Sequence, residues 1–447
     1  MLRTQSPWLH DCAADMIVNA SSRPSGEVLR VETLSREATC MVLLLALASI
    51  GHAQTEPLGT RLGEQVETTL TDPAYQQRRW DAFRLAPPPM RPSWSSGDFS
   101  AQLNAVAQVS YDDNILQDNQ QRLESVRSDL YPSLRFRWDP STAPSGTGVE
   151  VFYTPQLEWF ARYSQFNTIN HYAGANLAGV FGRTTAELHY QSAFYTEPDI
   201  LQTSRNQTHT ESVTLDATHE LGGKTRLSSE FEVGYGDIFS ETRYEESGGR
   251  LLLEYQVRER LAIGVGYGLR YVDTQPGFRL LSNEPQADLL WAYTDRLHVS
   301  LRVGAQISTV DGSASEMDPL VAGSLFYTAS DKTILRLEFS HQQWPSYYAA
   351  SQLNDITRVS AGLHHRFSER VFADLDADLG YNSQTSPLAS TASAGSYSFW
   401  SVACAIGYSF TPHMDCSLTY HHLERTSNLD TPNFDRNIAG VRITYRF

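Results

Sequence analysis

The feature that most constrains the fold is an alternation of apolar and polar residues that recurs along most of the chain. At the C-terminus, Phe447, Tyr445, Ile443 and Val441 occupy every second position, and polar or small residues stand between them. The same pattern returns in many segments, among them 261–271, 297–305 and 371–381. A period of two is typical of a β-strand with one apolar and one polar face. The chain is therefore expected to be all-β.

The connections between these segments distinguish two all-β architectures. A soluble sandwich and a membrane barrel both show alternation, so the pattern alone does not decide. Short turns such as FGRTT, LGGKT and YTDRL alternate along the chain with longer polar loops, such as 197–207 and 383–396. Short turns at one end and longer loops at the other are typical of outer-membrane barrels. We therefore predict an up-and-down antiparallel transmembrane β-barrel.

The number of alternating segments predicts about eighteen strands, with sixteen as the alternative. The predicted strands start near residues 101, 126, 148, 170, 184, 208, 225, 246, 260, 284, 296, 318, 332, 355, 370, 397, 413 and 435. Because a sheet in lipid cannot leave an unpaired edge, the last strand is expected to pair with the first. An even strand number places both ends of the barrel in the periplasm, with Phe447 in an aromatic girdle at that rim.

The residues before the barrel contain an export signal. The apolar run MVLLLALASIG at 41–51 is too short to span a bilayer. Arg30 and Arg36 precede it, and a small-x-small site ending at Ala53 follows it. These features predict a signal peptide over residues 1–53, with a polar leader longer than is usual.

Two further regions complete the predicted organisation. Residues 54–100 contain a proline cluster and are expected to form an extended periplasmic linker. Residues 101–447 are expected to form the barrel. The formal net charge of −16 is not that of a nucleic-acid-binding protein. We therefore expect no nucleic-acid partner. The predicted barrel and export signal together place the protein in the outer membrane of a Gram-negative bacterium, with membrane lipid as its partner.

The short turns also predict which residues lie opposite each other. If FSERV places Phe367 opposite Val371, His364 lies beside Asp374 on the next strand. If SFTPHMD is a turn, Cys404 lies near Tyr420, several residues along the strand from Cys416. That separation is too large for a disulfide.

Charged residues fall on the polar face, which is expected to line the lumen. The acidic ladder Asp374, Asp376 and Asp378 has two interpretations: a cation-preferring strip, or a balance for basic residues on the preceding strand. The predicted register favours the second interpretation. A basic cluster on the second predicted strand would create a transverse field if the two strands faced each other. The candidate selectivity residues are Asp374, Asp376, Asp378, Arg127, Arg135, Arg137, Arg358 and Arg366.

The first predicted hairpin carries a motif in which an aromatic residue precedes Asp-Asp-Asn-Ile. It consists of Tyr111, Asp112, Asp113, Asn114 and Ile115, and a second element follows with Ser128, Asp129, Pro132 and Leu134. In these residues the chain resembles a beta-barrel porin family of outer-membrane proteins, although Ser133 stands where that family has glycine. The resemblance covers residues 101–447. It implies no catalytic residues, and some family members are associated with exopolysaccharide production.

The C-terminal residues Phe447, Tyr445 and Ile443 are similar to the assembly signature of outer-membrane proteins. The similarity implies recognition by the barrel assembly machinery. The sequence leaves open whether the barrel forms a homo-oligomer. A trimer needs a flat apolar flank on each barrel, and alternation alone does not locate one.

Three functions remain open from the sequence, and an enzyme is the least favoured class. There is no phosphate-binding loop and no zinc spacing, so we expect no cofactor, no metal and no catalysis. The first interpretation is a passive or weakly selective channel for small polar solutes. The alternatives are export of a polysaccharide, or a loop-plugged structural or adhesive barrel. Export would favour lumen-facing aromatic and apolar residues, of which the assigned facing provides only a few; the candidates are Tyr131, Phe152, Phe160, Leu325 or Tyr327, and Trp400 if the facing is inverted there.

Overall fold

The computed structural model describes ten ranges of the chain. They are residues 93–117, 122–140, 147–199, 204–238, 242–275, 279–310, 315–345, 353–385, 395–428 and 433–447. The predicted signal peptide and most of the predicted linker lie outside these ranges. Within them, there is no helix long and apolar enough to cross a membrane.

The described ranges contain eighteen long strands, one short strand and one turn of 3-10 helix. The short elements are β1 (Trp94–Ser96) and η1 (Ser164–Phe166). The long strands are β2 (Phe99–Asp112), β3 (Ser125–Trp138), β4 (Gly148–Phe160), β5 (Thr168–Phe181), β6 (Thr184–Asp199), β7 (Ser204–Gly222), β8 (Thr225–Ile238), β9 (Thr242–Arg258), β10 (Leu261–Gln275), β11 (Arg279–Thr294), β12 (Leu297–Val310), β13 (Glu316–Ser330), β14 (Thr333–Pro345), β15 (Leu353–Arg366), β16 (Val371–Thr385), β17 (Ser396–Thr411), β18 (Met414–Ser427) and β19 (Phe434–Arg446). Each predicted start lies within five residues of an observed one.

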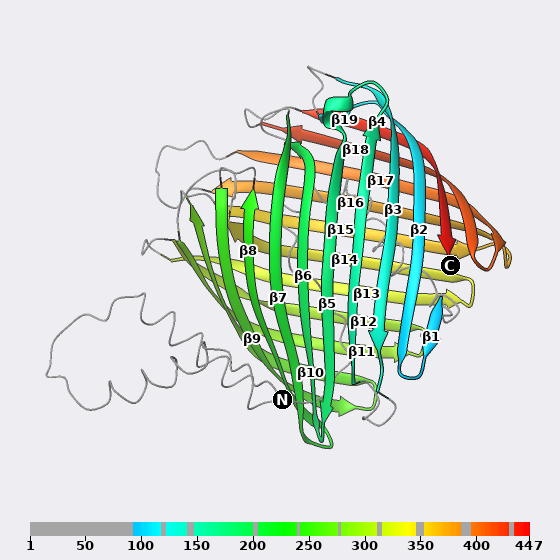
Figure 1. Cartoon of the computed structure of the whole chain (residues 1–447). Coiled ribbons are helices and arrows are strands. Elements are labelled where there is room, and N and C mark those ends of the chain that lie inside the picture. Colours follow the sequence, from blue (N-terminus) through cyan, green and yellow to red (C-terminus); the bar gives the residue numbers. More distant parts are fainter. Residues whose placement is uncertain are drawn as a thin grey trace, which may run out of the picture. The chain divides into compact units, whose positions relative to one another are not determined.

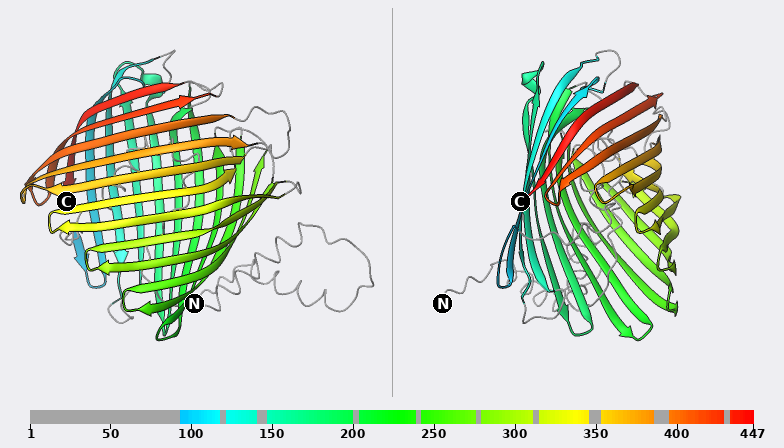
Figure 2. Two further views of the ribbon diagram at one scale, coloured as in Figure 1. Left: turned by 180° about the vertical axis from the view of Figure 1, so that it is seen from behind. Right: turned by 90° about the vertical axis from the view of Figure 1, so that its right-hand side faces the viewer.

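The long strands form one closed antiparallel sheet. Each strand from β2 onward pairs with the next along the chain, and β19 pairs with β2 (Figures 1 and 2). No edge among these strands is left unpaired, as the bilayer requires. We call the pairing of β2 with β19 the seam. The prediction of an eighteen-stranded up-and-down barrel is confirmed.

The two faces of the wall differ in character. On β10, Ile263, Val265 and Tyr267 point outward and are exposed, whereas the glycines between them point inward. Nearly all the exposed large hydrophobic residues of the other strands follow the same rule. Charged residues instead concentrate on the inner face, where a charge avoids the cost of facing lipid. This exterior is that of an outer-membrane β-barrel.

The hairpin registers agree with the predicted turns. His364 lies opposite Asp374, and Cys404 lies opposite Tyr420. Both Cys404 and Cys416 are free thiols. These registers were predictable because a short turn fixes which residues of its two strands are opposed.

The second element of the family motif coincides with a gap in strand pairing. The β3–β4 register passes from Leu130 directly to Leu134, and Pro132 lies in the gap. Proline has no N–H group and cannot complete a ladder at that point. Ser133 accepts a hydrogen bond of 3.0 Å from the hydroxyl of Thr154, so the residue that replaces the expected glycine ties the two strands together beside the gap.

The periplasmic end of the seam is covered by a strand that the sequence analysis did not predict. β1 pairs with the start of β2, on the edge that β19 does not reach. The hydroxyl of Ser93 donates to the carbonyl oxygen of Phe447 (2.5 Å) and accepts from the amide of Leu103 (3.0 Å). The ring of Phe447 packs edge-on against Tyr445, with centroids 4.6 Å apart. The predicted linker thus ends in a strand that protects the wall.

Several glycines in the wall lie beneath the aromatic ring of their direct cross-strand partner. A Cβ atom added to Gly380 would lie 2.1 Å from the ring of Phe399, and one added to Gly407 would lie 2.1 Å from Phe372. The same arrangement pairs Gly174 with Phe152, Gly236 with Tyr244 and Gly323 with Phe339. The missing side chain leaves room for each ring to lie along the wall. The inward-facing rings of Phe399, Phe372, Phe152 and Tyr244 therefore cover the wall instead of projecting into the lumen, and Phe339 lies along the outer face in the same way.

Candidate functional site: the inner wall of the barrel

The acidic ladder on β16 faces inward but is not open to water. Asp374, Asp376 and Asp378 are 8%, 6% and 2% exposed. His364 Nδ1 lies 2.5 Å from Asp374 Oδ1, and Arg358 Nη2 lies 2.7 Å from Asp378 Oδ1. Buried carboxylates need such partners because their hydration is lost. For these two carboxylates, the geometry is that of a structural charge balance.

One of the three arginines in the basic cluster of β3, which consists of Arg127, Arg135 and Arg137, is also buried in a structural network. Arg127 Nε lies 3.0 Å from Asp129 Oδ2, and Arg127 Nη1 lies 3.2 Å from Glu158 Oε1. All three side chains are almost completely buried on the inner face of β3 and β4. A single guanidinium therefore contacts two carboxylates that have almost no access to bulk water.

The other predicted arginines lie nearer the periplasmic end. The side chains of Arg135 and Arg137 are 47% and 59% exposed. Arg135 is 3.7 Å from Glu150, and Arg137 is 2.6 Å from Asp139. Arg366 is half-buried at the end of β15. Arg135 and Arg137 are therefore available to influence ions that enter the periplasmic mouth.

The acidic ladder and the basic cluster do not face each other across the barrel. From β16 the wall passes through β17, β18, β19 and β2 to reach β3, which is five places along. Opposite strands in a wall of eighteen would be nine places apart. The transverse field that depends on these two groups facing each other therefore does not follow from the fold.

A second acidic group, which the sequence analysis did not single out, is open to the lumen. Glu187, Asp216 and Glu230 are direct cross-strand neighbours on β6, β7 and β8. Their side chains are 46%, 36% and 30% exposed. We call these three residues the acidic row. It is the part of the inner wall where adjacent carboxylates meet water.

Arg250, and His189 when it is protonated, partly balance the acidic row. His189 Nε2 lies 3.5 Å from Glu187 and 3.8 Å from Asp216, and Arg250 Nη2 lies 2.6 Å from Glu230. Like charges directly opposite each other on neighbouring strands are destabilising, so the row needs these partners. The turn LGGKT contains part of the signal for this row, because it sets the register of β7 and β8 and so places Asp216 opposite Glu230. No short turn joins β6 to β7, so the position of Glu187 opposite Asp216 has no such signal.

The histidine pairs and acidic groups do not form a metal centre. Within the described ranges, no group of three or more His, Cys, Asp or Glu side chains is placed to hold a metal ion. His364 and His421 are buried on the inner face, and their neighbours His365 and His422 lie on the outer face. Each pair therefore presents one imidazole to each side of the wall.

The aromatic and apolar candidates for a saccharide path divide between the two faces. Tyr131, Phe152 and Phe160 face inward, and Leu325, Tyr327 and Trp400 face outward. Tyr131 and Phe160 are buried, and Phe152 lies over Gly174. Other inward rings are covered by guanidinium groups, with Arg270 4.3 Å from the ring of Trp344 and Arg425 4.5 Å from that of Tyr397.

The two remaining groups of predicted residues lie at opposite ends of the seam. The C-terminal Phe447, Tyr445 and Ile443 point outward and are exposed at and above the periplasmic rim. The segment Tyr111–Ile115 lies at the extracellular end, where β2 leaves the wall.

Comparisons with known proteins locate similar folds only at low similarity. No protein-family model and no curated protein matches the sequence. Among solved structures, the outer membrane protein OpdK from Pseudomonas aeruginosa is 12% identical, with a TM-score of 0.43, and the similarity covers 78% of this chain and 99% of that one. OccK2 (OpdF) of Pseudomonas aeruginosa, in complex with glucuronate, is 12% identical with a TM-score of 0.42, covering 78% and 98%. A bacterial polysaccharide outer membrane secretin is 10% identical with a TM-score of 0.34, covering 79% and 100%. Values this low say nothing about what passes through this barrel.

Proposed function

We propose that the protein is a porin-like channel through which small polar solutes diffuse across the outer membrane. The observation that supports this function is the acidic row: three neighbouring carboxylates stay exposed on the inside of a closed barrel whose outside is apolar. A wall of eighteen strands encloses an interior too wide for side chains alone to fill. Exposed charge on that wall suits water and hydrated solutes.

The acidic row gives the channel a preference for cations. Glu187, Asp216 and Glu230 are opposed by His189 and Arg250, so the group carries a net negative charge when His189 is neutral. A lumen wall of one sign raises the local concentration of counter-ions and so their rate of entry. Because the ladder on β16 is buried, and Asp374 and Asp378 have partners in His364 and Arg358, its three carboxylates contribute less to this preference.

Neutralising the acidic row is expected to reduce cation selectivity. In the variant Glu187→Gln with Asp216→Asn and Glu230→Gln, the K⁺ to Cl⁻ permeability ratio should fall severalfold towards one, because the exposed charge is removed. The ratio is measured from the reversal potential in planar bilayers with asymmetric KCl. A matched control removes three acidic residues from short connecting turns, Glu259→Gln with Asp295→Asn and Asp331→Asn, and should keep the wild-type ratio. An unchanged ratio in the first variant would exclude the acidic row as the selectivity element.

Export of a polysaccharide is the weaker candidate for the same barrel. It would use inward aromatic surfaces, of which Tyr172 and Tyr195 form one stacked pair with centroids 6.3 Å apart. Tyr172, Tyr131 and Phe160 are buried, however, so they present little surface to a passing saccharide.

We also propose that Phe447, with Tyr445 and Ile443, is the signal that the barrel assembly machinery recognises. Support comes from the exposed outward position of these residues at the periplasmic end.

A further inference from the structure

The seam differs from the hairpins in how its register can be set. β2 and β19 are joined by no turn, and their ladder contains nine register pairs, from Asn104–Arg446 to Asp112–Ile438. On its other side, β2 pairs with β3 through fourteen register pairs. A slip of two residues along the seam would keep every side chain on its own face, so the apolar pattern alone does not prevent it.

Inside the barrel, a buried ion pair joins the two strands where the seam ladder ends. Arg436 Nε and Nη2 donate to Asp112 Oδ1 and Oδ2 over 3.0 and 2.5 Å. Both side chains are buried. A two-point contact between a guanidinium and a carboxylate has a fixed geometry, so it adds specificity to the pairing of the two strands.

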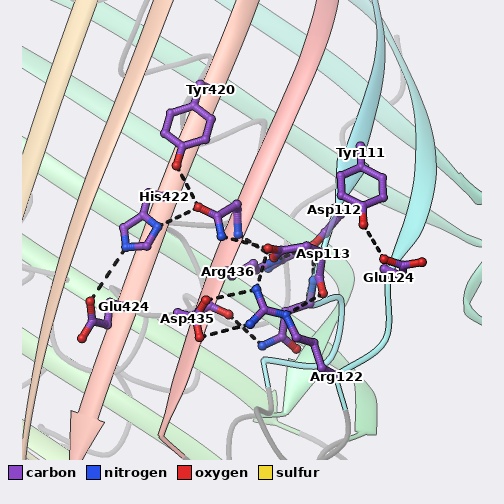
Figure 3. A network of polar contacts seen from close by, with 12 residues as sticks. Tyr111, Asp112, Asp113, Arg122, Glu124, Tyr420, His422, Glu424, Asp435 and Arg436 are labelled. Carbon is purple, nitrogen blue, oxygen red and sulfur yellow. Dashed lines mark hydrogen bonds and ion pairs between the residues drawn. The ribbon is translucent and has the colours of Figure 1, made fainter.

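Outside the barrel, Asp113 continues the ladder with its side chain (Figure 3). The amide of Asp113 donates to the carbonyl of Asn437 (3.1 Å), as in an ordinary ladder. The reciprocal bond from the amide of Asn437 goes to Asp113 Oδ1 (2.7 Å), and Asn437 Nδ2 donates to Asp113 Oδ2 (2.8 Å). The carboxylate therefore takes the place of a main-chain carbonyl at the point where β2 turns away.

Two more residues connect this turn to the start of β19. Arg122 lies 2.5 Å from Asp113 Oδ2 and 3.0 Å from Asp435 Oδ2, and its Nε donates to the carbonyl of Asp113. Asn114 Nδ2 donates to the carbonyl of Asp435 over 2.8 Å, while its amide donates to Asp112 Oδ1. We call these seam contacts the seam network. Its members are Asp112, Asp113, Asn114, Arg122, Asp435, Arg436 and Asn437.

The first and last residues of the motif hold the turn in place. The hydroxyl of Tyr111 donates to Glu124 Oε2 over 2.5 Å (Figure 3). Ile115 is fully buried against Phe160, and its amide donates to the carbonyl of Leu123. Every residue of the Tyr-Asp-Asp-Asn-Ile motif thus either joins the seam network or supports it.

We propose that this motif fixes the register in which β2 and β19 close the barrel. In the slipped register that places Gln108 opposite Thr444, Asp112 and Arg436 would be four residues out of register, whereas in the opposite slip they would lie directly across from each other. In both slips Asp113 would no longer pair with Asn437, so the contacts of the carboxylate with the amide and side chain of Asn437 would be lost. The native register is the one in which these contacts form together. The motif therefore acts as a closure device, independent of what the lumen conducts.

Cysteine pairs across the seam report its register. The amide of Phe447 donates to the carbonyl of Leu103 across the seam. Seam pairs of odd-numbered residues are therefore hydrogen-bonded, and pairs of even-numbered residues are non-hydrogen-bonded, with their side chains closer together. Val106 and Thr444 form an even pair, which suits a disulfide.

The reporters are placed in a chain with Cys404→Ala and Cys416→Ala. Val106→Cys with Thr444→Cys reports the native register. Ser110→Cys with Ile438→Cys and Gln108→Cys with Thr444→Cys report slips of two residues in the two directions.

The test variant is Asp112→Asn with Asp113→Asn, refolded in lipid and oxidised. With the wild-type motif, only the native reporter should form its disulfide. With Asp112→Asn and Asp113→Asn, a smaller fraction of the native reporter should form its disulfide, and one of the slip reporters should now form one. The control is Asp378→Asn, which disrupts the buried ion pair between Asp378 and Arg358. This pair joins β15 and β16, whose register is set by a short turn, so the control should form a disulfide only in the native reporter. A variant that crosslinks only in the native reporter, as the control does, would overturn the proposal.

A variant that does not fold is tested by covalent rescue. The native reporter pair is added to Asp112→Asn with Asp113→Asn, and the folded, heat-modifiable band is measured on a gel with and without reductant during refolding. If the motif acts by closing the barrel, the folded band should return only under oxidising conditions, when the disulfide holds β2 and β19 together. No return of the band would overturn the proposal, because the defect would then lie outside the seam.

Discussion

Replacing Arg127 with methionine is expected to lower the free energy of unfolding by about 3–5 kcal/mol, because it leaves two buried carboxylates without their counter-charge. Asp129 and Glu158 both contact this guanidinium, at 3.0 and 3.2 Å. The measurement is reversible urea unfolding in phospholipid vesicles, followed by tryptophan fluorescence.

Two further variants separate the buried charge from the lost side chain. Adding Asp129→Asn and Glu158→Gln to Arg127→Met should restore most of the stability, since no unpaired charge then remains. Arg260→Met removes an exposed arginine whose partner Asp295 is 89% exposed, and should cost about 0–1 kcal/mol. Equal losses for Arg127→Met and Arg260→Met would contradict the described burial of the Arg127 network.

An arginine placed on the outer face of β9 should destabilise the barrel according to its depth in the membrane. Leu253→Arg lies near the middle of the apolar band and should cost about 2–4 kcal/mol. Val257→Arg, beside the periplasmic end of the same strand, should cost about 0–1 kcal/mol. Both residues are exposed outward-facing side chains, so they differ in depth and little in packing.

The same urea titration in vesicles measures the free energy of unfolding of both variants. A third variant on the same strand gives the corresponding value for the inner face. Leu252→Arg points into the lumen on the same strand and tests whether a positive charge is tolerated on that side. A similar cost for Leu253→Arg and Val257→Arg would mean that the outer face of β9 does not lie in a bilayer, against the assignment of an outer-membrane barrel.

The strands and their hairpin registers could be predicted because both depend on local sequence. Alternation identifies a strand and its faces, and a short turn fixes which residues are opposed. The turns alone therefore predict that His364 lies beside Asp374 and that Cys404 lies near Tyr420, and the barrel has both pairs in register. Within the acidic row, the pairing of Asp216 with Glu230 follows from the same rule, but that of Glu187 with Asp216 does not, because no short turn joins β6 to β7. The carboxylates of the row lie on three different strands, so no local run of acidic residues marks it in the sequence.

Burial and the register in which the barrel closes could not be predicted in this way. Alternation assigns a side chain to the inner face but does not say whether partners cover it, so Asp378 and Glu230 are equivalent in sequence although one is buried and the other is exposed. The contacts of Asp112 and Asp113 lie 324 positions further along the chain, at Arg436 and Asn437. No turn connects them, so the function of the motif in the seam depends on the folded barrel.

The most direct test of the channel is the conductance of single molecules of the refolded protein in a planar bilayer. The proposed function predicts steady conductance steps, with a reversal potential in asymmetric KCl that shows preference for K⁺ over Cl⁻. Protein that is folded by its heat-modifiable mobility, yet conducts no ions, would contradict the proposal of an open channel and favour a barrel closed by its own chain.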